Sequence, residues 1–145
     1  MIQIAIQGLE QLTSKLNRFN KGLNKAVEHT TTEAVIFVHA NIPDYPEKPA
    51  TSTYVRRHLL WNSITTFMGR APGALSRVSK LAGEIQGFIG TKVEYAHWVI
   101  DKEDQTRVHK EHGWWNLQDV VLGLKGGITN IYQNGINRYV RSIFK

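Results

Sequence analysis

The chain has 145 residues, a formal net charge of +6 at pH 7 and no cysteine. Its length fits a single domain, residues 1–145, with one hydrophobic core that buries roughly two-thirds of the unfolded surface. The lack of cysteine excludes disulfides, thiolate nucleophiles and every zinc or iron–sulfur site with cysteine ligands.

The sequence carries no signal for a membrane. No apolar run approaches the ~20 residues that span a bilayer. The first residues, Met1 to Ile4, have neither the basic region nor the apolar region of a signal peptide. We therefore expect a protein that is made and kept in the cytoplasm, or in a particle assembled there, without a membrane partner.

The excess positive charge follows residue 50. Residues 1–50 contain equal numbers of basic and acidic side chains, so residues 51–145 carry the whole +6. No acid occurs between Glu47 and Glu84. This segment indicates a positive field suited to DNA phosphate or to an acidic protein surface, or else a solvated basic loop. Its basic residues are Lys48, Arg56, Arg57, Arg70, Arg77 and Lys80.

The first third of the chain predicts a short strand and then a long amphipathic helix. Residues 2–7 alternate apolar and polar side chains, which is typical of a strand. From Leu9 the apolar side chains recur every three or four residues, which predicts a helix that ends near Asn41, because Pro43 disfavours a helical residue before it. Gly22 lies within this stripe and leaves open one helix or two in series. The stripe is longer than one small sheet can cover, so we expect part of it to meet a neighbouring subunit.

The middle of the chain predicts two strands separated by long loops. Residues 43–55 contain most of the prolines and predict an exposed, semi-extended arm. Residues 54–60 suit a short helical turn, and residues 60–67 alternate well enough to predict a strand. Residues 68–83 predict a long loop between strands, and residues 84–90 predict a second strand. The side chains on one face of that strand are those of Ile85, Gly87 and Ile89.

The last third predicts a final helix after a polar loop. Residues 93–100 can cover the sheet, and residues 101–113 predict an exposed loop or hairpin because they contain a single aliphatic side chain. Trp114 opens a predicted amphipathic helix that runs toward the end of the chain. Its glycines weaken it alone but permit close approach of another helix. These glycines are Gly123, Gly126, Gly127 and Gly135.

Together the elements predict an α+β fold. A long N-terminal amphipathic helix and a C-terminal helix are expected to pack on a small antiparallel β-sheet with long loops.

Catalytic signals are weak. The best group is His97, His109 and His112 with Glu111, whose imidazoles and carboxylate could bind a divalent metal and activate water. Their spacing differs from the His-Glu-x-x-His pattern of metalloproteases, and the stretch is polar. The glycines near Gly126 lack the lysine of a phosphate-binding loop, and no serine has a nucleophile-elbow context. We expect no enzyme activity, no cofactor and no metal site, and a metal-dependent hydrolase is the least supported alternative.

The aromatic side chains allow two interpretations. Interleaved with arginines, they could stack on bases. Such residues more often fill a core or anchor an interface, and we expect Trp61 and Trp98 in the core. Contacts with a partner or a neighbouring subunit are predicted at Tyr45, Tyr54, Arg56, Arg57, Arg70, Arg77, Lys80 and Trp114.

The segment from Tyr54 to Ile64 has the pattern Tyr-x-Arg-x-x-x-Leu-x-x-Ser-Ile, and a Tyr-Ala pair follows it after Gly90. This order of elements and motifs resembles the gp-ten-like minor tail and neck proteins of lambdoid long-tailed bacteriophages, which act in tail completion and head–tail joining. Their motif is close to Tyr-Val-Arg-Thr-Gly-x-Leu-x-x-Ser-Ile, and this chain departs from it at Arg57 and His58, where Thr-Gly is common. The positions that match are Tyr54, Val55, Arg56, Leu60, Ser63, Ile64, Tyr95 and Ala96.

The resemblance implies a structural virion protein in place of an enzyme. Its subunits would form a homo-oligomeric ring, a hexamer or dodecamer, in the neck at the head-to-tail interface, after assembly in the host cytoplasm. The ring would join the connector, or head-closure protein, to the tail-terminator or tail-tube proteins, and DNA would pass through its channel non-specifically. We expect the arm 43–55 and the loop 68–83 to make the inter-subunit or axial contacts. The alternative is a basic nucleic-acid-binding protein that uses Arg56, Arg57, Arg70, Arg77 and Lys80.

Overall fold

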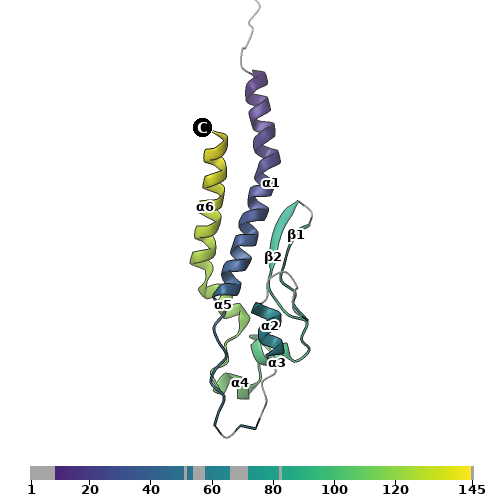
Figure 1. The fold of residues 1–145 in the computed structure, drawn as a ribbon, viewed down its shortest axis with the longest axis vertical. Coiled ribbons are helices and arrows are strands. Elements are labelled where there is room, and N and C mark those ends of the chain that lie inside the picture. Colours follow the sequence, from purple (N-terminus) through teal and green to yellow (C-terminus); the bar gives the residue numbers. More distant parts are fainter. Residues whose placement is uncertain (1–8, 51, 54–57, 66–71, 82, 145) are drawn as a thin grey trace, which may run out of the picture.

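The computed structural model describes residues 9–50, 52–53, 58–65, 72–81 and 83–144. This part of the chain contains two long helices, an antiparallel hairpin and a group of short helices (Figure 1). The α+β class expected from the sequence is confirmed. The predicted strand at residues 2–7 lies outside the described residues, as do residues 54–57 of the predicted helical turn.

Helix α1 (Leu9–Ala40) is continuous. Gly22 does not interrupt it, and the ring of Tyr139 occupies the space that a side chain would fill there. The helix ends where expected, just before Pro43, and residues 42–49 form neither helix nor strand. Among its described side chains, the apolar and threonine side chains that are buried are those of Thr30, Thr31, Ala34, Val35 and Val38.

Strands β1 (Arg77–Leu81) and β2 (Glu84–Phe88) form an antiparallel hairpin in which Arg77 lies opposite Phe88. Gly83 in the turn has φ +87°, a conformation that glycine adopts without strain. The predicted strand at 84–90 is confirmed, but the predicted loop at 68–83 is wrong for the residues of β1. β1 reads Arg-Val-Ser-Lys-Leu, in which Val78 is the one interior aliphatic residue, so its sequence pattern is too short to distinguish a strand from a loop.

The remaining helices are α2 (Leu59–Thr65), α3 (Ala96–Ile100), α4 (Arg107–Glu111), α5 (Leu117–Gly123) and α6 (Lys125–Ile143). The strand predicted at 60–67 is wrong for residues 60–65, because Leu60 and Ile64 are buried at helical spacing in α2; residues 66 and 67 lie outside the described chain. The polar stretch 101–113 contains helix α4. The final helix begins at Leu117, not at Trp114, and is divided in two at Leu124.

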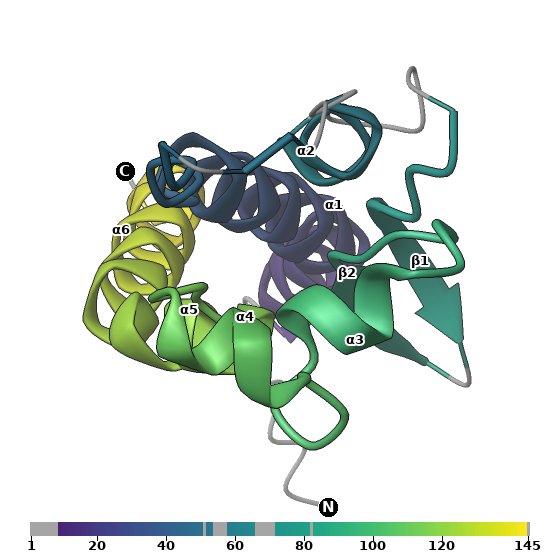
Figure 2. The same cartoon turned by 90° about the horizontal axis from the view of Figure 1, so that it is seen from below.

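Helix α6 runs antiparallel along α1, and α1 lies between α6 and the hairpin (Figure 2). Two of its glycines allow this close approach, as the sequence predicted. A β-carbon at Gly135 would collide with the side chain of Thr30, and one at Gly127 would collide with the ring of Phe37. The hydroxyl of Tyr132 donates a hydrogen bond of 2.8 Å to Thr31 Oγ1. Glycines of α6 therefore lie against larger side chains of α1, and the two helices pack closely.

The hairpin covers a different side of α1. A β-carbon at Gly87 would lie 2.7 Å from Val35 Cγ2 and 3.1 Å from Thr31 Cγ2, so this face of β2 rests directly on α1. Ile85 and Gly87 share that face, as predicted, and Phe88 lies on the other. Glycine is needed here because β2 and α1 leave no room for a side chain.

The first part of α1 extends past its partners. The last residues of α6 reach the level of Phe19, whose ring centroid lies 6.0 Å from that of Phe144. Residues 9–18 of α1 therefore project by ~15 Å beyond the end of α6, and Figure 1 shows them rising above both α6 and the hairpin. The sequence predicted that part of the helical stripe meets a neighbouring subunit, and no other helix or strand of the described residues lies beside this projection.

Candidate functional site

The described residues of the segment that carries the phage-like pattern contribute to a buried cluster, together with Ala96 of the Tyr-Ala landmark. Helices α2 and α3 pack against each other through buried aliphatic side chains, and Ala96 of the landmark lies in this contact. The buried members of this cluster are Ile42, Leu60, Ile64, Ala96, Val99 and Ile100. Leu60 and Ile64 of the pattern therefore join α2 to α3, and Leu117 of α5 packs against the same cluster. The region of the short helices α2–α5 is termed the short-helix cluster below.

Ser63 connects the two landmarks through hydrogen bonds. Its Oγ is fully buried, donates to the carbonyl of Leu60 at 2.8 Å and lies 2.7 Å from Thr91 Oγ1. Because the serine has one proton and gives it to Leu60, Thr91 must donate to Ser63. Thr91 Oγ1 also accepts from the backbone N–H of Val93 at 3.0 Å. A small hydroxyl at position 63 thus joins α2 to the segment that leads into α3.

His58 has an unusual backbone conformation. Its φ is +52°, the left-handed region that non-glycine residues enter at a cost of about 1–2 kcal/mol. The carbonyl of His58 accepts a hydrogen bond of 2.9 Å from the N–H of Asn62, so this residue starts α2. In the pattern that the chain resembles, position 58 is the glycine of Thr-Gly. The local geometry is therefore the one that the glycine of that pattern would accommodate without strain.

The predicted basic residues are only partly within the described chain. Tyr54, Arg56, Arg57 and Arg70 lie outside the described residues. Arg77 is exposed on the outer face of the hairpin, with its guanidinium 5.2 Å from the centroid of the Phe88 ring.

Lys80 is also exposed, but it lies opposite Ile85 on the face toward α1. The two described cations of the predicted set therefore lie on opposite faces of the hairpin.

Tyr45 and Trp114, predicted at an interface, pack within the subunit. Their ring centroids lie 4.7 Å apart, and the Tyr45 ring meets that of Trp61 at 5.3 Å. All three side chains are half-buried against the core of the short-helix cluster. This contact holds the arm of residues 43–50 against the subunit, and the indole N–H of Trp115 also donates to the carbonyl of Asp44 at 3.3 Å.

Trp98 was predicted in the core, and this is wrong. It is 53% exposed, with its ring 4.4 Å from that of His97. The short helix α3 explains the difference, because helical spacing places Ala96, Val99 and Ile100 on the buried side and turns Trp98 outward.

Gln105 is a structural anchor that the sequence pattern did not reveal. It is 7% exposed, and its amide Nε2 donates to the carbonyls of Val99 at 2.6 Å and Trp114 at 3.1 Å. A single side chain therefore joins the end of α3 to the segment that precedes α5. The residue lies in a polar stretch, and nothing in the local composition distinguishes it from the exposed side chains around it.

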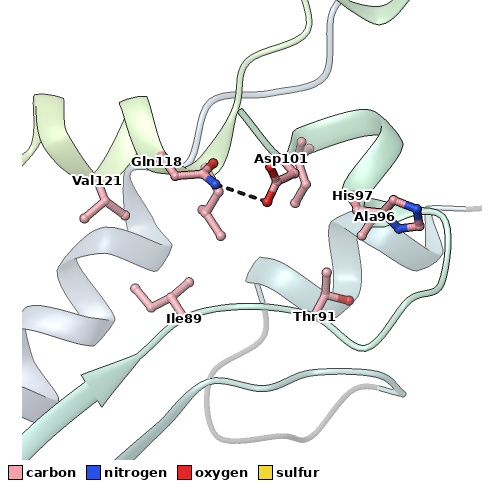
Figure 3. A pocket seen from close by; sticks show the side chains of 9 residues that line it. Ile89, Thr91, Ala96, His97, Asp101, Gln118 and Val121 are labelled. Carbon is pink, nitrogen blue, oxygen red and sulfur yellow. Dashed lines mark hydrogen bonds between the residues drawn. The ribbon is translucent and has the colours of Figure 1, made fainter. Parts of the chain in front are cut away.

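A pocket of about 460 Å³ lies between the end of β2, helix α3 and helix α5 (Figure 3). Its apolar wall includes Ile89 and Val121, which point into it from opposite sides. Its polar side holds Asp101 and Gln118, joined by a hydrogen bond of 3.1 Å from Gln118 Nε2 to Asp101 Oδ2. The complete lining is Ile89, Thr91, Ala96, His97, Ile100, Asp101, Leu117, Gln118 and Val121.

The polar side of the pocket is organised around an ionised carboxylate. The backbone N–H of Glu103 donates to Asp101 Oδ1 at 2.9 Å, and this hydrogen bond, with smaller contributions from Gln118 and His97, lowers the pKa of Asp101. Apolar walls beside a fixed anion suit a cationic group on an apolar stem, such as a lysine or arginine side chain. The Thr91 hydroxyl is already committed to Ser63, so the pocket offers no activated nucleophile.

Helix α5 is held beside the pocket by its own cap. Asn116 Oδ1 accepts from the N–H of Asp119 at 2.8 Å, and Asn116 Nδ2 donates to Asp119 Oδ2 at 2.8 Å. Asp119 also pairs with Lys102 at 2.6 Å, and its hydrogen bonds with Lys102 and Asn116 lower its pKa.

The histidines considered as metal ligands are His97, His109 and His112. Among the described residues, no group of three or more His, Cys, Asp or Glu side chains could hold a metal ion. His109 Nδ1 lies 2.7 Å from Thr106 Oγ1, and its ring stacks edge-on against Trp114 at 5.4 Å. Burial is the main cause that lowers the pKa of His109. Its ring therefore serves as a packing element of α4.

Within the described part of the chain, no helix is both long enough and apolar enough to cross a membrane. Comparisons with protein-family models, with curated proteins and with solved structures found no match to this chain.

Proposed function

We propose that this chain is a structural virion protein of a tailed bacteriophage. Its copies form a homo-oligomeric ring in the neck, which joins the connector to the tail and encloses the DNA channel. The subunit binds partners and catalyses no reaction. The hexameric or dodecameric state, and contact with head-closure and tail-terminator or tail-tube proteins, belong to the same proposal.

The observation that carries this proposal is the conformation of His58. The phage-like pattern has glycine at this position, and here the backbone has φ +52° in a histidine. The resemblance rests on residue identities. A backbone conformation that favours glycine, at the position where the pattern has glycine, is independent support for it. The matching residues Leu60, Ser63 and Ile64 support it further, because all three are buried.

The shape of the subunit gives a second argument for assembly. Residues 9–18 of α1 project beyond α6. A projecting helix gains little stability by itself. It gains a partner if identical subunits contact one another head to tail, and such contacts close into rings.

The test is the state of the purified protein. We expect multi-angle light scattering to show a closed oligomer of constant mass above a threshold concentration, and negative-stain electron microscopy to show rings with an axial hole. A monomer at every concentration up to the millimolar range would overturn the proposal. Fluorescence anisotropy with a DNA duplex discriminates the nucleic-acid-binding alternative, which requires affinity that falls steeply as salt is raised.

A further inference from the structure

The outer edge of the hairpin is available for another strand. Strand β2 lies between α1 and β1, so the far edge of β1 faces away from the subunit (Figures 1 and 2). Leu75 N–H donates to the carbonyl of Gly90 at 3.1 Å, and hydrogen-bonded pairs recur at every second residue of an antiparallel ladder. The N–H and C=O groups of Val78 and Lys80 therefore point outward, and no third strand pairs with them in the described part of the chain.

One segment of the chain has the sequence that such an edge accepts. Residues 2–7 read Ile-Gln-Ile-Ala-Ile-Gln, the alternation of a one-sided strand. Added beside β1, its isoleucines would extend the apolar face that Val78 and Ile85 turn toward α1. Its glutamines would lie with Ser79 and Gln86 on the polar face.

Residues 2–8 are too few for residues 2–7 to lie along β1 of their own subunit. Gly87 packs against Thr31, which lies about 22 residues, or ~33 Å, along α1 from Leu9. The tip of the hairpin is ~13 Å closer to Leu9 than Gly87 is, which still leaves ~20 Å. Residues 2–8, fully extended and folded back, span at most ~25 Å. They would end near the tip and could not lie alongside β1.

We propose that residues 2–7 of one copy pair with the outer edge of β1 in a second copy and complete a three-stranded sheet. Each subunit donates its strand to one neighbour and receives a strand from the other, which is the head-to-tail contact that a ring requires. The inference rests on the proposed assembly of identical subunits, and it specifies the surfaces that meet.

Because the chain has no cysteine, disulfide cross-linking can test the pairing directly. An acceptor variant, Ser79→Cys, is mixed with single-cysteine donors at each position from 3 to 7, oxidised mildly and analysed on a non-reducing gel. Disulfides need Cα atoms within about 7 Å. We expect donors at positions 3, 5 and 7, on the face of Ser79, to give several-fold more cross-linked dimer than donors at 4 and 6.

The matched control acceptor is Lys125→Cys, an exposed residue at the start of α6, which should show no alternation among the donors. Equal yields at all donor positions, or no cross-link to position 79, would overturn the inference. So would an intramolecular disulfide in the double variant Ala5→Cys/Ser79→Cys at high dilution.

Deletion of residues 2–7 separates this inference from the proposed function. We expect the deleted chain to keep its helical circular dichroism, because the contacts between α1 and α6 begin near Arg18 and Phe19, and to lose its oligomers in light scattering. If the deleted chain still forms the ring, the strand exchange is wrong and the ring stands. If the complete chain forms no oligomer, both proposals fail.

Discussion

The same substitution at two glycines of α6 should have opposite effects on stability. Alanine is favoured over glycine within a helix by about 0.5–1 kcal/mol. At Gly126 an added β-carbon meets nothing within 4 Å, so Gly126→Ala should raise the free energy of unfolding by that amount. At Gly135 the added carbon would lie 2.9 Å from Thr30 Cγ2 and 3.1 Å from its Cβ, distances at which the helices must move apart.

The cost at Gly135 follows from the rigidity of its neighbour. Thr30 is 1% exposed, its hydroxyl donates to the carbonyl of Ala26 at 2.7 Å, and a β-branched side chain has little rotamer freedom in a helix. Overpacking of this kind costs about 1–3 kcal/mol. After the helix-propensity gain, Gly135→Ala should destabilise the protein by about 1–2 kcal/mol, which separates the two variants by about 2 kcal/mol.

Urea denaturation followed by circular dichroism at 222 nm, at one fixed protein concentration, measures both effects. Thr30→Ala in the Gly135→Ala background should recover at least about 1 kcal/mol as a coupling energy, because it removes the colliding groups. Shifts of the same sign in the two glycine variants, or additive effects of the Thr30 and Gly135 substitutions, would refute the packing described for α1 and α6.

Three further substitutions test the short-helix cluster and the end of α1. Gln105→Met should lower the free energy of unfolding by about 2–3 kcal/mol, because it leaves the carbonyls that the amide serves without donors; a urea midpoint equal to that of the parent would contradict this. His58→Gly should raise the thermal midpoint by a few degrees by relieving up to about 1 kcal/mol of backbone strain, and a lower midpoint would mean that the histidine side chain contributes more than the strain costs. Burial lowers the pKa of His39, against an opposing backbone hydrogen bond at Ile64, so the unfolded chain binds the proton more tightly. Stability should therefore fall as the pH drops through 6.5, the ordinary histidine value, and His39→Gln should flatten that part of the unfolding profile. An unchanged slope in that variant would assign the acid sensitivity to another group.

The elements that the sequence predicted best are those with long periodic patterns. The stripe from Leu9 predicted α1 and its end before Pro43, and the glycines of the last helix predicted close approach, which occurs at Gly127 and Gly135. Short segments were harder to assign. The sequence pattern of residues 59–65 fits either a strand or a helix. These residues form a helix, in which Leu60 and Ile64 pack on α3 from one side.

The burial of individual aromatic side chains was also hard to predict from the sequence. Tyr45 and Trp114, predicted to contact a partner, are half-buried against the short-helix cluster, whereas Trp98, predicted in the core, lies exposed. Composition gives the frequency with which a residue type is buried, but the direction of a side chain depends on the helix phase, which a five-residue helix such as α3 does not reveal in advance.

Four features could be predicted from the residues alone: the fold class, the long amphipathic helix, the lack of cysteine chemistry and the places where two helices could approach closely. Each of these follows from residue type or from a pattern repeated over several turns. Three others became known from the folded subunit: Gln105 joins α3 to the segment before α5, Arg77 and Lys80 lie on opposite faces, and α1 projects past its partners. Those features depend on contacts between residues far apart in the chain, and local periodicity carries no record of such contacts.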